Sequence, residues 1–142
     1  MATGVMPRAG REDGGKLLLR LTVGGLLLFH GVAKAMGGIG WMAGPLSAIG
    51  LPAFIGYGVF LGEIVAPILV IVGKFSRLAG LVIAFNMLMA ILLVRRDAIF
   101  SINEQGGGWG IELELLFLLG GIAIFLFGSG RYALSRGEGR WD

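Results

Sequence analysis

Glu63 is the residue of this chain whose setting points most strongly to chemistry. It lies inside an apolar run, residues 53–73, that is long enough to span a bilayer. Pro67 follows one helical turn later and has no N–H, so it cannot donate a hydrogen bond to the carbonyl of Glu63. A charged side chain near mid-bilayer costs about 2.5–3.5 kcal/mol on insertion scales, and such residues usually face a protein interior. We therefore take Glu63 as the candidate catalytic residue, with proton exchange as its role.

Four further polar residues lie in other apolar runs and are candidates for binding a ligand: His30, Lys34, Asn86 and Glu112. His30 and Lys34 are four residues apart and share one helix face. With neighbouring helices antiparallel and a rise of about 1.5 Å per residue, all four lie in the same half of the bilayer as Glu63. The sequence thus predicts one polar cluster to which every helix contributes.

The fourth run begins with two acidic residues, Glu112 and Glu114, that point roughly 200° apart on a helix, so only one can face the bundle centre. We favour Glu112 because it shares a helix face with Leu115, Leu116 and Leu119.

These polar residues also admit structural interpretations. Glu63 could be a neutral acid that hydrogen-bonds between helices, or it could form an ion pair with Lys34 or His30. Asn86 could act only as an interhelical hydrogen-bonding residue, and Lys34 could extend to the membrane surface. The sequence leaves these alternatives open beside a site for a ligand or a proton.

The composition indicates a membrane protein. Hydrophobic residues make up 56% of the 142 residues and charged residues only 15%, against about 25% in soluble domains. There is no cysteine, which excludes disulfides, iron–sulfur clusters and thiol chemistry within this chain. A single histidine makes a protein-bound metal or haem unexpected, and the net charge of +3 reflects membrane topology rather than nucleic-acid binding.

Four apolar runs of helical length predict an all-α, four-helix transmembrane bundle. The predicted helices span about residues 17–36, 53–73, 78–94 and 109–128, within a domain of residues 17–128. Residues 1–16 and 129–142 are predicted to be polar, mobile tails. Small-residue patterns, Gly58–Gly62 and Gly80–Ala84, predict close helix packing within the bundle or with a second copy of the chain.

The positive residues predict the orientation of the bundle. With the N-terminus inside, nine of the 12 Lys and Arg residues face the cytoplasm. The other three are Lys34, Arg95 and Arg96. Both termini are therefore predicted to be cytoplasmic, and the polar cluster lies in the outer half of the bundle.

The ordered set of motifs resembles the DoxX family of small bacterial four-helix membrane proteins. The resemblance covers roughly residues 17–134 and rests on four segments: Phe29–Lys34, Gly62-Glu63 with Gly73 and Arg77 behind it, Glu112–Glu114, and Gly128–Leu134. It implies a protein of the bacterial cytoplasmic membrane that is linked to redox chemistry. Relatives are associated with quinone-dependent oxidation of thiosulfate, or with complexes that hold sulfurtransferase or superoxide dismutase partners.

The resemblance and the polar cluster lead to three hypotheses. The first is a quinone-interacting subunit of a membrane oxidoreductase: Lys34 or His30 donates a hydrogen bond to the quinone, Glu63 exchanges a proton, and a partner protein supplies electrons. The second is a non-catalytic scaffold that recruits redox or sulfur-metabolism partners. The third is a pathway for a small solute or proton, which is weakened because the inner halves of the second, third and fourth runs hold no ionisable residue.

Overall fold

The described part of the chain, residues 8–142 of a computed structural model, is all-helical and contains no β-strand. Its five α-helices are α1 (Arg8–Gly37), α2 (Ala43–Ala48), α3 (Ala66–Val72), α4 (Ser76–Leu93) and α5 (Glu112–Phe127). Short 3₁₀ turns, η1 (Gly40–Met42), η2 (Ala53–Gly58) and η4 (Arg96–Ala98), link them, and a π-helical turn, η3 (Leu61–Val65), leads into α3. The predicted all-α class is confirmed.

Among residues 8–142, three helical segments are long and apolar enough to cross a membrane: Arg8–Gly37, Ala53–Val72 and Ser76–Leu93. The fourth predicted span corresponds to α5, which is only 16 residues long. At about 1.5 Å per residue α5 extends roughly 24 Å, less than the ~30 Å hydrocarbon core. Its length alone therefore does not define a span.

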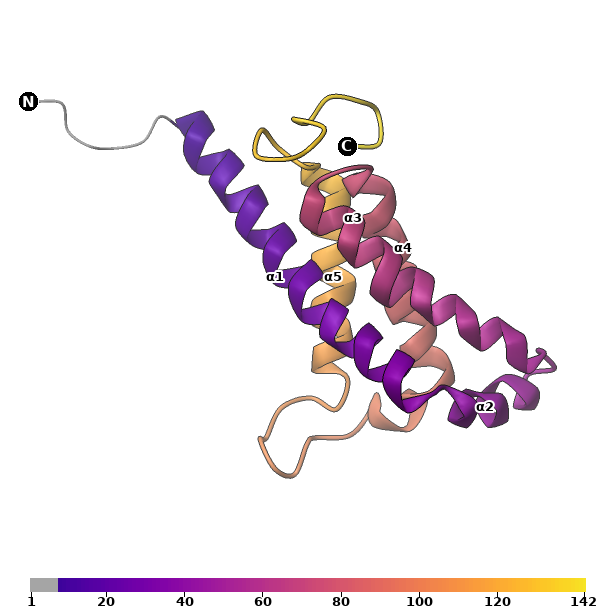
Figure 1. The fold of residues 1–142 in the computed structure, drawn as a ribbon. Helices are drawn as coiled ribbons and strands as arrows, with labels where there is room; N and C mark the ends of the chain where they lie inside the picture. Colours follow the sequence, from indigo (N-terminus) through magenta and orange to yellow (C-terminus); the bar gives the residue numbers. More distant parts are fainter. Residues whose placement is uncertain (1–7) are drawn as a thin grey trace, which may run out of the picture.

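The helices lie side by side in a bundle whose two ends differ (Figure 1). The start of α1 and the C-terminal segment occupy one end, while α2 and the 94–111 loop occupy the other. The core contains apolar side chains from α1, α3, α4 and α5: Val23, Leu27, Ala66, Val70, Ala79, Ile83, Met87, Phe117 and Ile124. We call the end with α2 and the loop the α2 end, and the opposite one the tail end.

Helices α4 and α5 approach each other closely because glycines face each other at their crossing. A Cβ atom added at Gly80 would lie 2.5 Å from the carbonyl oxygen of Gly121, and one added at Gly121 would lie 2.6 Å from that of Gly80. The small-residue pattern that begins at Gly80 thus marks a real close contact within the bundle.

Both predicted tails differ from expectation. Residues 8–16 form the first turns of α1, and residues 1–7 lie outside the described part of the chain. Residues 129–142 lack regular helix, yet they pack on the tail end instead of forming a free tail. The backbone of Leu134 donates a hydrogen bond to Val72, and that of Ser135 donates one to Gly73.

Arg20 explains why the C-terminal segment is held in place. It is only 1% exposed, and its guanidinium donates to four backbone carbonyls. Two belong to the last turn of α3, Val70 at 2.8 Å and Ile71 at 3.0 Å. The other two belong to the C-terminal segment, Ser129 at 2.8 Å and Tyr132 at 2.9 Å. Arg20 therefore ties α1 to the end of α3 and to the segment that follows α5.

Candidate functional site

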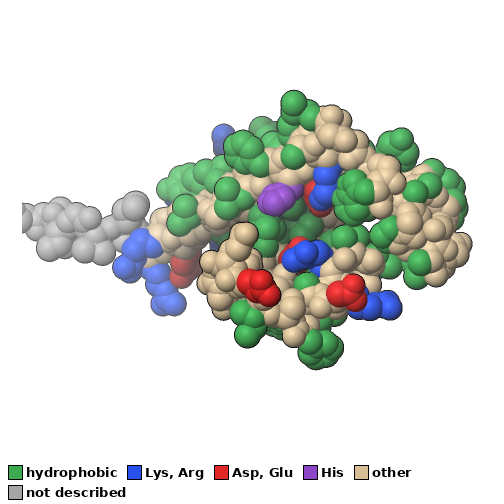
Figure 2. Space-filling view, turned by 90° about the horizontal axis from the view of Figure 1, so that it is seen from below, with side chains coloured by type: hydrophobic (Ala, Val, Ile, Leu, Met, Phe, Trp, Pro, Cys, Tyr) green, Lys and Arg blue, Asp and Glu red, His purple; other side chains and the backbone are tan. Residues whose placement is uncertain are grey.

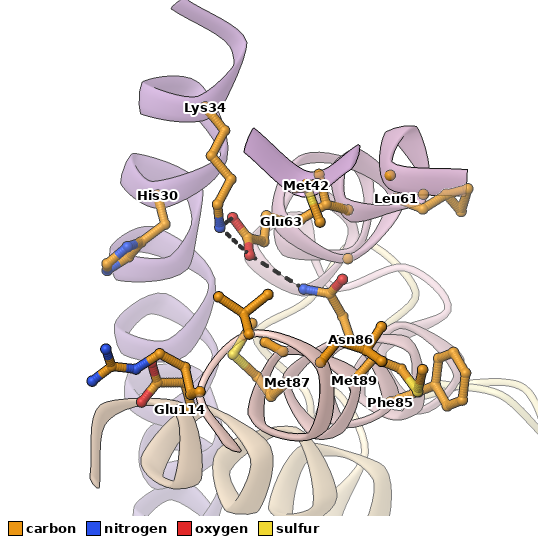
Figure 3. A pocket seen from close by; sticks show the side chains of 18 of the residues that line it. His30, Lys34, Met42, Leu61, Glu63, Phe85, Asn86, Met87, Met89 and Glu114 are labelled. Atoms are coloured by element: carbon orange, nitrogen blue, oxygen red, sulfur yellow. Dashed lines mark hydrogen bonds and ion pairs between the residues drawn. The ribbon is translucent and has the colours of Figure 1, made fainter. Parts of the chain in front are cut away.

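The carboxylate of Glu63 is buried at the junction of three helical segments. The side chain, on η3, is 2% exposed. The ammonium of Lys34, on α1, lies 2.6 Å from one carboxylate oxygen and 2.5 Å from the other. The amide of Asn86, on α4, donates a longer hydrogen bond of 3.3 Å to the first oxygen (Figure 3). Of the alternatives left open by the sequence, the structure contains the ion pair between Glu63 and Lys34.

The local sequence places Glu63 on an unusual helical turn. Pro67 cannot donate to the carbonyl of Glu63, and the chain forms a π turn here, with the N–H of Ala66 bonded to the carbonyl of Leu61. Such π turns occur frequently at functional sites. Gly31 on α1 lies directly against the backbone carbonyl of Glu63, because an added Cβ atom would collide with it. The backbone around Glu63 is therefore tightly enclosed by α1.

The carboxylate, in contrast, adjoins a cavity of about 670 Å³. Ligand pockets typically have volumes of about 300–1,000 Å³ and are apolar with a few polar groups, and this cavity matches that description. Its polar walls are provided by His30, Lys34, Glu63, Asn86, Arg95 and Glu114. Seen from the α2 end, the surface is hollowed, with charged side chains and the histidine around the hollow (Figure 2).

Short helical segments in and beside residues 37–52, which lie between the first two predicted helices, also line this cavity. Trp41 and Met42 in η1, Leu46 in α2 and Gly56 in η2 all contribute to its wall. Leu46 is buried. The 37–52 segment is therefore part of the pocket, and the run of apolar residues from Ile39 to Leu51 was the signal that could have indicated this.

His30 lies on the cavity wall but does not join the ion pair. Its ring is exposed and packs edge-on against Phe117 of α5, with ring centroids 5.7 Å apart. Within residues 8–142 it makes no hydrogen bond to Glu63. It remains available at the pocket surface for a ligand.

The two acidic residues at the start of α5 occupy positions opposite to those expected. Glu114 lines the cavity, and Arg95 lies 3.2 Å from its carboxylate. Glu112 is exposed, outside the cavity lining, and its carboxylate lies over Gly108. The preference for Glu112 was therefore wrong about orientation. Because every face of α5 is apolar, the leucines that share a face with Glu112 carried no directional information.

Arg95, which the sequence indicated only as one of three positive residues on the outer side, lines the pocket. It follows α4, bonds to Glu114, and donates a 2.8 Å hydrogen bond to the carbonyl of Gly110. It thereby joins the end of α4 to the start of α5 at the rim of the cavity. A second charged pair, outside the Glu63 cluster, therefore borders the same cavity.

These features define a helical membrane protein with a largely apolar pocket between its helices and a few polar groups on the pocket wall. The chain belongs to the DoxX family, whose family model matches residues 15–96. No solved structure matches it.

Similar proteins occur in three bacteria. A Bacillus subtilis protein named "Putative oxidoreductase CatD" is 33% identical over 123 residues, which cover 84% of each chain. An uncharacterized membrane protein of Mycobacterium tuberculosis is 32% identical over 128 residues, 84% of this chain and 78% of the relative. An uncharacterized Haemophilus influenzae protein is 32% identical over 120 residues, 82% of this chain and 84% of the relative.

Proposed function

We propose that this chain is a quinone-interacting subunit of a membrane redox complex in the bacterial cytoplasmic membrane. The observation that carries the proposal is the buried carboxylate of Glu63, which forms the polar end of a large apolar cavity. The name of the Bacillus subtilis relative, which includes the word oxidoreductase, agrees with redox chemistry.

The proposed topology is a bundle of four transmembrane helices with both termini in the cytoplasm. The fourth span would be α5, extended by the residues before it from Trp109 onward. The tail end carries nine Lys and Arg residues, which favours a cytoplasmic location for it. The cavity at the α2 end then lies in the outer half of the membrane.

The cavity offers hydrogen-bond donors for the carbonyl groups of a quinone and apolar side chains for its ring and tail. An ammonium group has three N–H donors, and two of those of Lys34 are directed to Glu63, which leaves the third for a quinone carbonyl. The exposed ring of His30 provides a second candidate donor. Apolar side chains such as Phe85 and Met89 on α4 would contact the ring and the tail.

In this proposal Lys34 and Glu63 also handle protons. A quinone accepts two electrons and two protons to become a quinol. The ion pair would pass protons to the quinone oxygen and regain them from the hollow at the α2 end, while a redox partner protein would donate both electrons. Glu63 acts as the proton-exchanging group because its carboxylate can hold a proton in place of the bond to Lys34.

The test is to purify the protein from its native membrane and to quantify bound quinone in wild type and in Glu63→Gln. We expect about one quinone per chain in wild type and a large loss in the variant, since the proposal makes Glu63 part of the site. The matched control is Glu104→Gln, an exposed acid in the 94–111 loop, which should retain the quinone. Wild-type protein without quinone above the lipid background would contradict the proposal.

A non-catalytic scaffold is the second candidate function. The observation that favours it is that both oxygens of Glu63 are already bonded, so the cluster could serve only to fix the positions of α1, η3 and α4. On that hypothesis Glu63→Gln would weaken the fold, and no quinone would be bound in either form. The same purification therefore distinguishes the two functions.

A further inference from the structure

A second cavity, at the opposite end of the bundle from Glu63, is surrounded by positive charge. It has a volume of about 420 Å³ and lies between the start of α1, the start of α4 and the C-terminal segment. Four basic residues line it: Lys16, Arg77, Arg131 and Arg136. Two acidic residues, Asp13 and Asp142, also line it, so its lining side chains carry a net charge of +2.

Several of these lining groups are fixed by bonds to the protein itself. Arg77 donates to the backbone carbonyls of Phe125 at 2.7 Å and Leu126 at 3.1 Å, which orients its guanidinium at the end of α5. Asp13 accepts a 3.2 Å hydrogen bond from the backbone N–H of Arg131 and lies 4.0 Å from Lys16. The cavity is thus assembled from parts of the chain that are more than 100 residues apart in sequence.

Arg131 and Arg136 differ from the half-buried Arg77 because their side chains are exposed. Within residues 8–142, neither side chain forms an ion pair with an acidic group. Arg136 also has a left-handed backbone conformation, with φ of 56°, which is unfavourable for a residue other than glycine. Its N–H is bonded to the carbonyl of Ala133 at 3.0 Å. Backbone strain of this kind is often found where a side chain has a function.

One apolar side chain lines this basic cavity, and other exposed apolar side chains are close to the lining residues in sequence. Phe127 forms part of its wall, and Phe127, Leu126 and Leu134 are all exposed. A site with positive charge beside exposed apolar groups, at the end of membrane-spanning helices, provides contacts for a phosphate group and for the acyl chains attached to it.

We propose that this cavity binds the phosphate group of an anionic phospholipid, with Arg131 and Arg136 as the main contacts. Arginine suits this role because its planar guanidinium can donate two parallel hydrogen bonds to phosphate oxygens. A bound lipid would connect the start of α1 to the C-terminal segment and stabilise the tail end of the bundle. Free phosphate shares the same chemistry, so the experiment has to separate these two sources.

The experiment uses full-length protein in neutral detergent and counts bound lipids by native mass spectrometry. Phosphatidylglycerol, phosphatidylcholine and inorganic phosphate are added in separate titrations. The test variant is Arg131→Gln/Arg136→Gln, and a second variant, Arg131→Lys/Arg136→Lys, retains the charge. The charge-matched control is Arg11→Gln/Arg140→Gln, which removes two exposed arginines that do not line the cavity.

We expect wild type to bind phosphatidylglycerol saturably and in preference to phosphatidylcholine. Since each basic residue near a membrane surface contributes about fivefold in affinity for anionic lipid, the test variant should bind about 30-fold more weakly. The lysine variant should recover part of the loss, and the control should bind as wild type does.

Three results would overturn the proposal. One is that phosphatidylglycerol and phosphatidylcholine bind equally and that inorganic phosphate does not bind. Another is an equal loss in the charge-matched control, which would indicate diffuse attraction rather than a site. If inorganic phosphate binds in dependence on Arg131 and Arg136 while phosphatidylglycerol binds no better than phosphatidylcholine, the lipid proposal is overturned and free phosphate is the ligand of the site.

Discussion

Glu63 and Arg20 are both buried charged side chains, yet their surroundings differ. Glu63 is 2% exposed, and its partners are two side chains beside a cavity of about 670 Å³. Arg20 is 1% exposed, and its partners are four backbone carbonyls in the packed tail end. Side-chain partners can reorient or exchange protons, whereas backbone carbonyls in a packed segment are fixed.

This difference shows that burial of a charge does not by itself identify a functional site. Arg20 satisfies carbonyls at the end of α3 that have no donor within the helix, which is a structural role. Glu63 combines burial with an adjoining space that a ligand can enter. The predictions below test whether the two charges differ in this way.

The largest expected effect on stability is that of Arg20→Met. The substitution removes four hydrogen bonds and leaves buried carbonyls without donors, so we expect a loss of about 3–5 kcal/mol in the free energy of unfolding. Unfolding in mixed micelles measures it, with Arg11→Met, an exposed arginine on the same helix, as the control. A loss as small as that of the control would show that the tail end does not depend on Arg20.

The next effect comes from separating Lys34 from Glu63. Lys34→Met leaves a buried carboxylate without its cation, and we expect a loss of about 2–3 kcal/mol because the side chain of Lys34 is 26% exposed and solvent compensates in part. The double variant Lys34→Met/Glu63→Gln should recover about 1–2 kcal/mol of that loss, since it leaves no unpaired charge. Additive losses in this double-mutant cycle would mean that the two residues are not coupled.

A smaller effect should follow from filling the contact at Gly31. Gly31→Ala places a methyl group against the backbone of Glu63, and we expect a loss of about 1–3 kcal/mol from overpacking. Gly25→Ala on the same helix is the matched control, because no atom lies within 4 Å of an added Cβ there. If both variants unfold alike, α1 does not enclose η3 tightly.

The smallest effect separates the two acidic residues of α5. Glu114→Gln should cost up to about 1 kcal/mol at low salt, because its pair with Arg95 is partly exposed, and the cost should shrink at high salt. Glu112→Gln should leave stability unchanged, since Glu112 lies outside the pocket lining. Thermal unfolding at two salt concentrations compares them, and the opposite ranking would return Glu112 to the pocket.

The sequence was sufficient to predict those features that depend on side-chain type and spacing. The apolar runs predicted an all-α membrane protein. Of the predicted cluster of His30, Lys34, Glu63, Asn86 and Glu112, the structure joins Lys34, Glu63 and Asn86, whereas His30 lies apart on the cavity wall and Glu112 lies outside the lining. An ion pair between Lys34 and Glu63 was among the alternatives.

The features that it could not predict depend on backbone geometry. Arg20 was counted only as a positive charge for topology, because its partners are carbonyl groups, which every residue carries. The π turn at Glu63 and the start of α5 at Glu112 determine which way the side chains point. The spacing of apolar residues in the sequence does not specify these directions. This is why Glu114, and not Glu112, lines the cavity.

The position of Arg20 near the start of the chain has a consequence for synthesis. Its two carbonyl partners in the C-terminal segment lie 109 and 112 residues further along. At about 5–20 residues per second, a ribosome completes that segment roughly 5–20 s after it has made Arg20. Until then the guanidinium can bond at most to Val70 and Ile71 of α3, and its remaining donors have to be solvated by water or lipid head groups. Arg20 therefore becomes fully enclosed only after Ser129 and Tyr132 have been made and have packed against it.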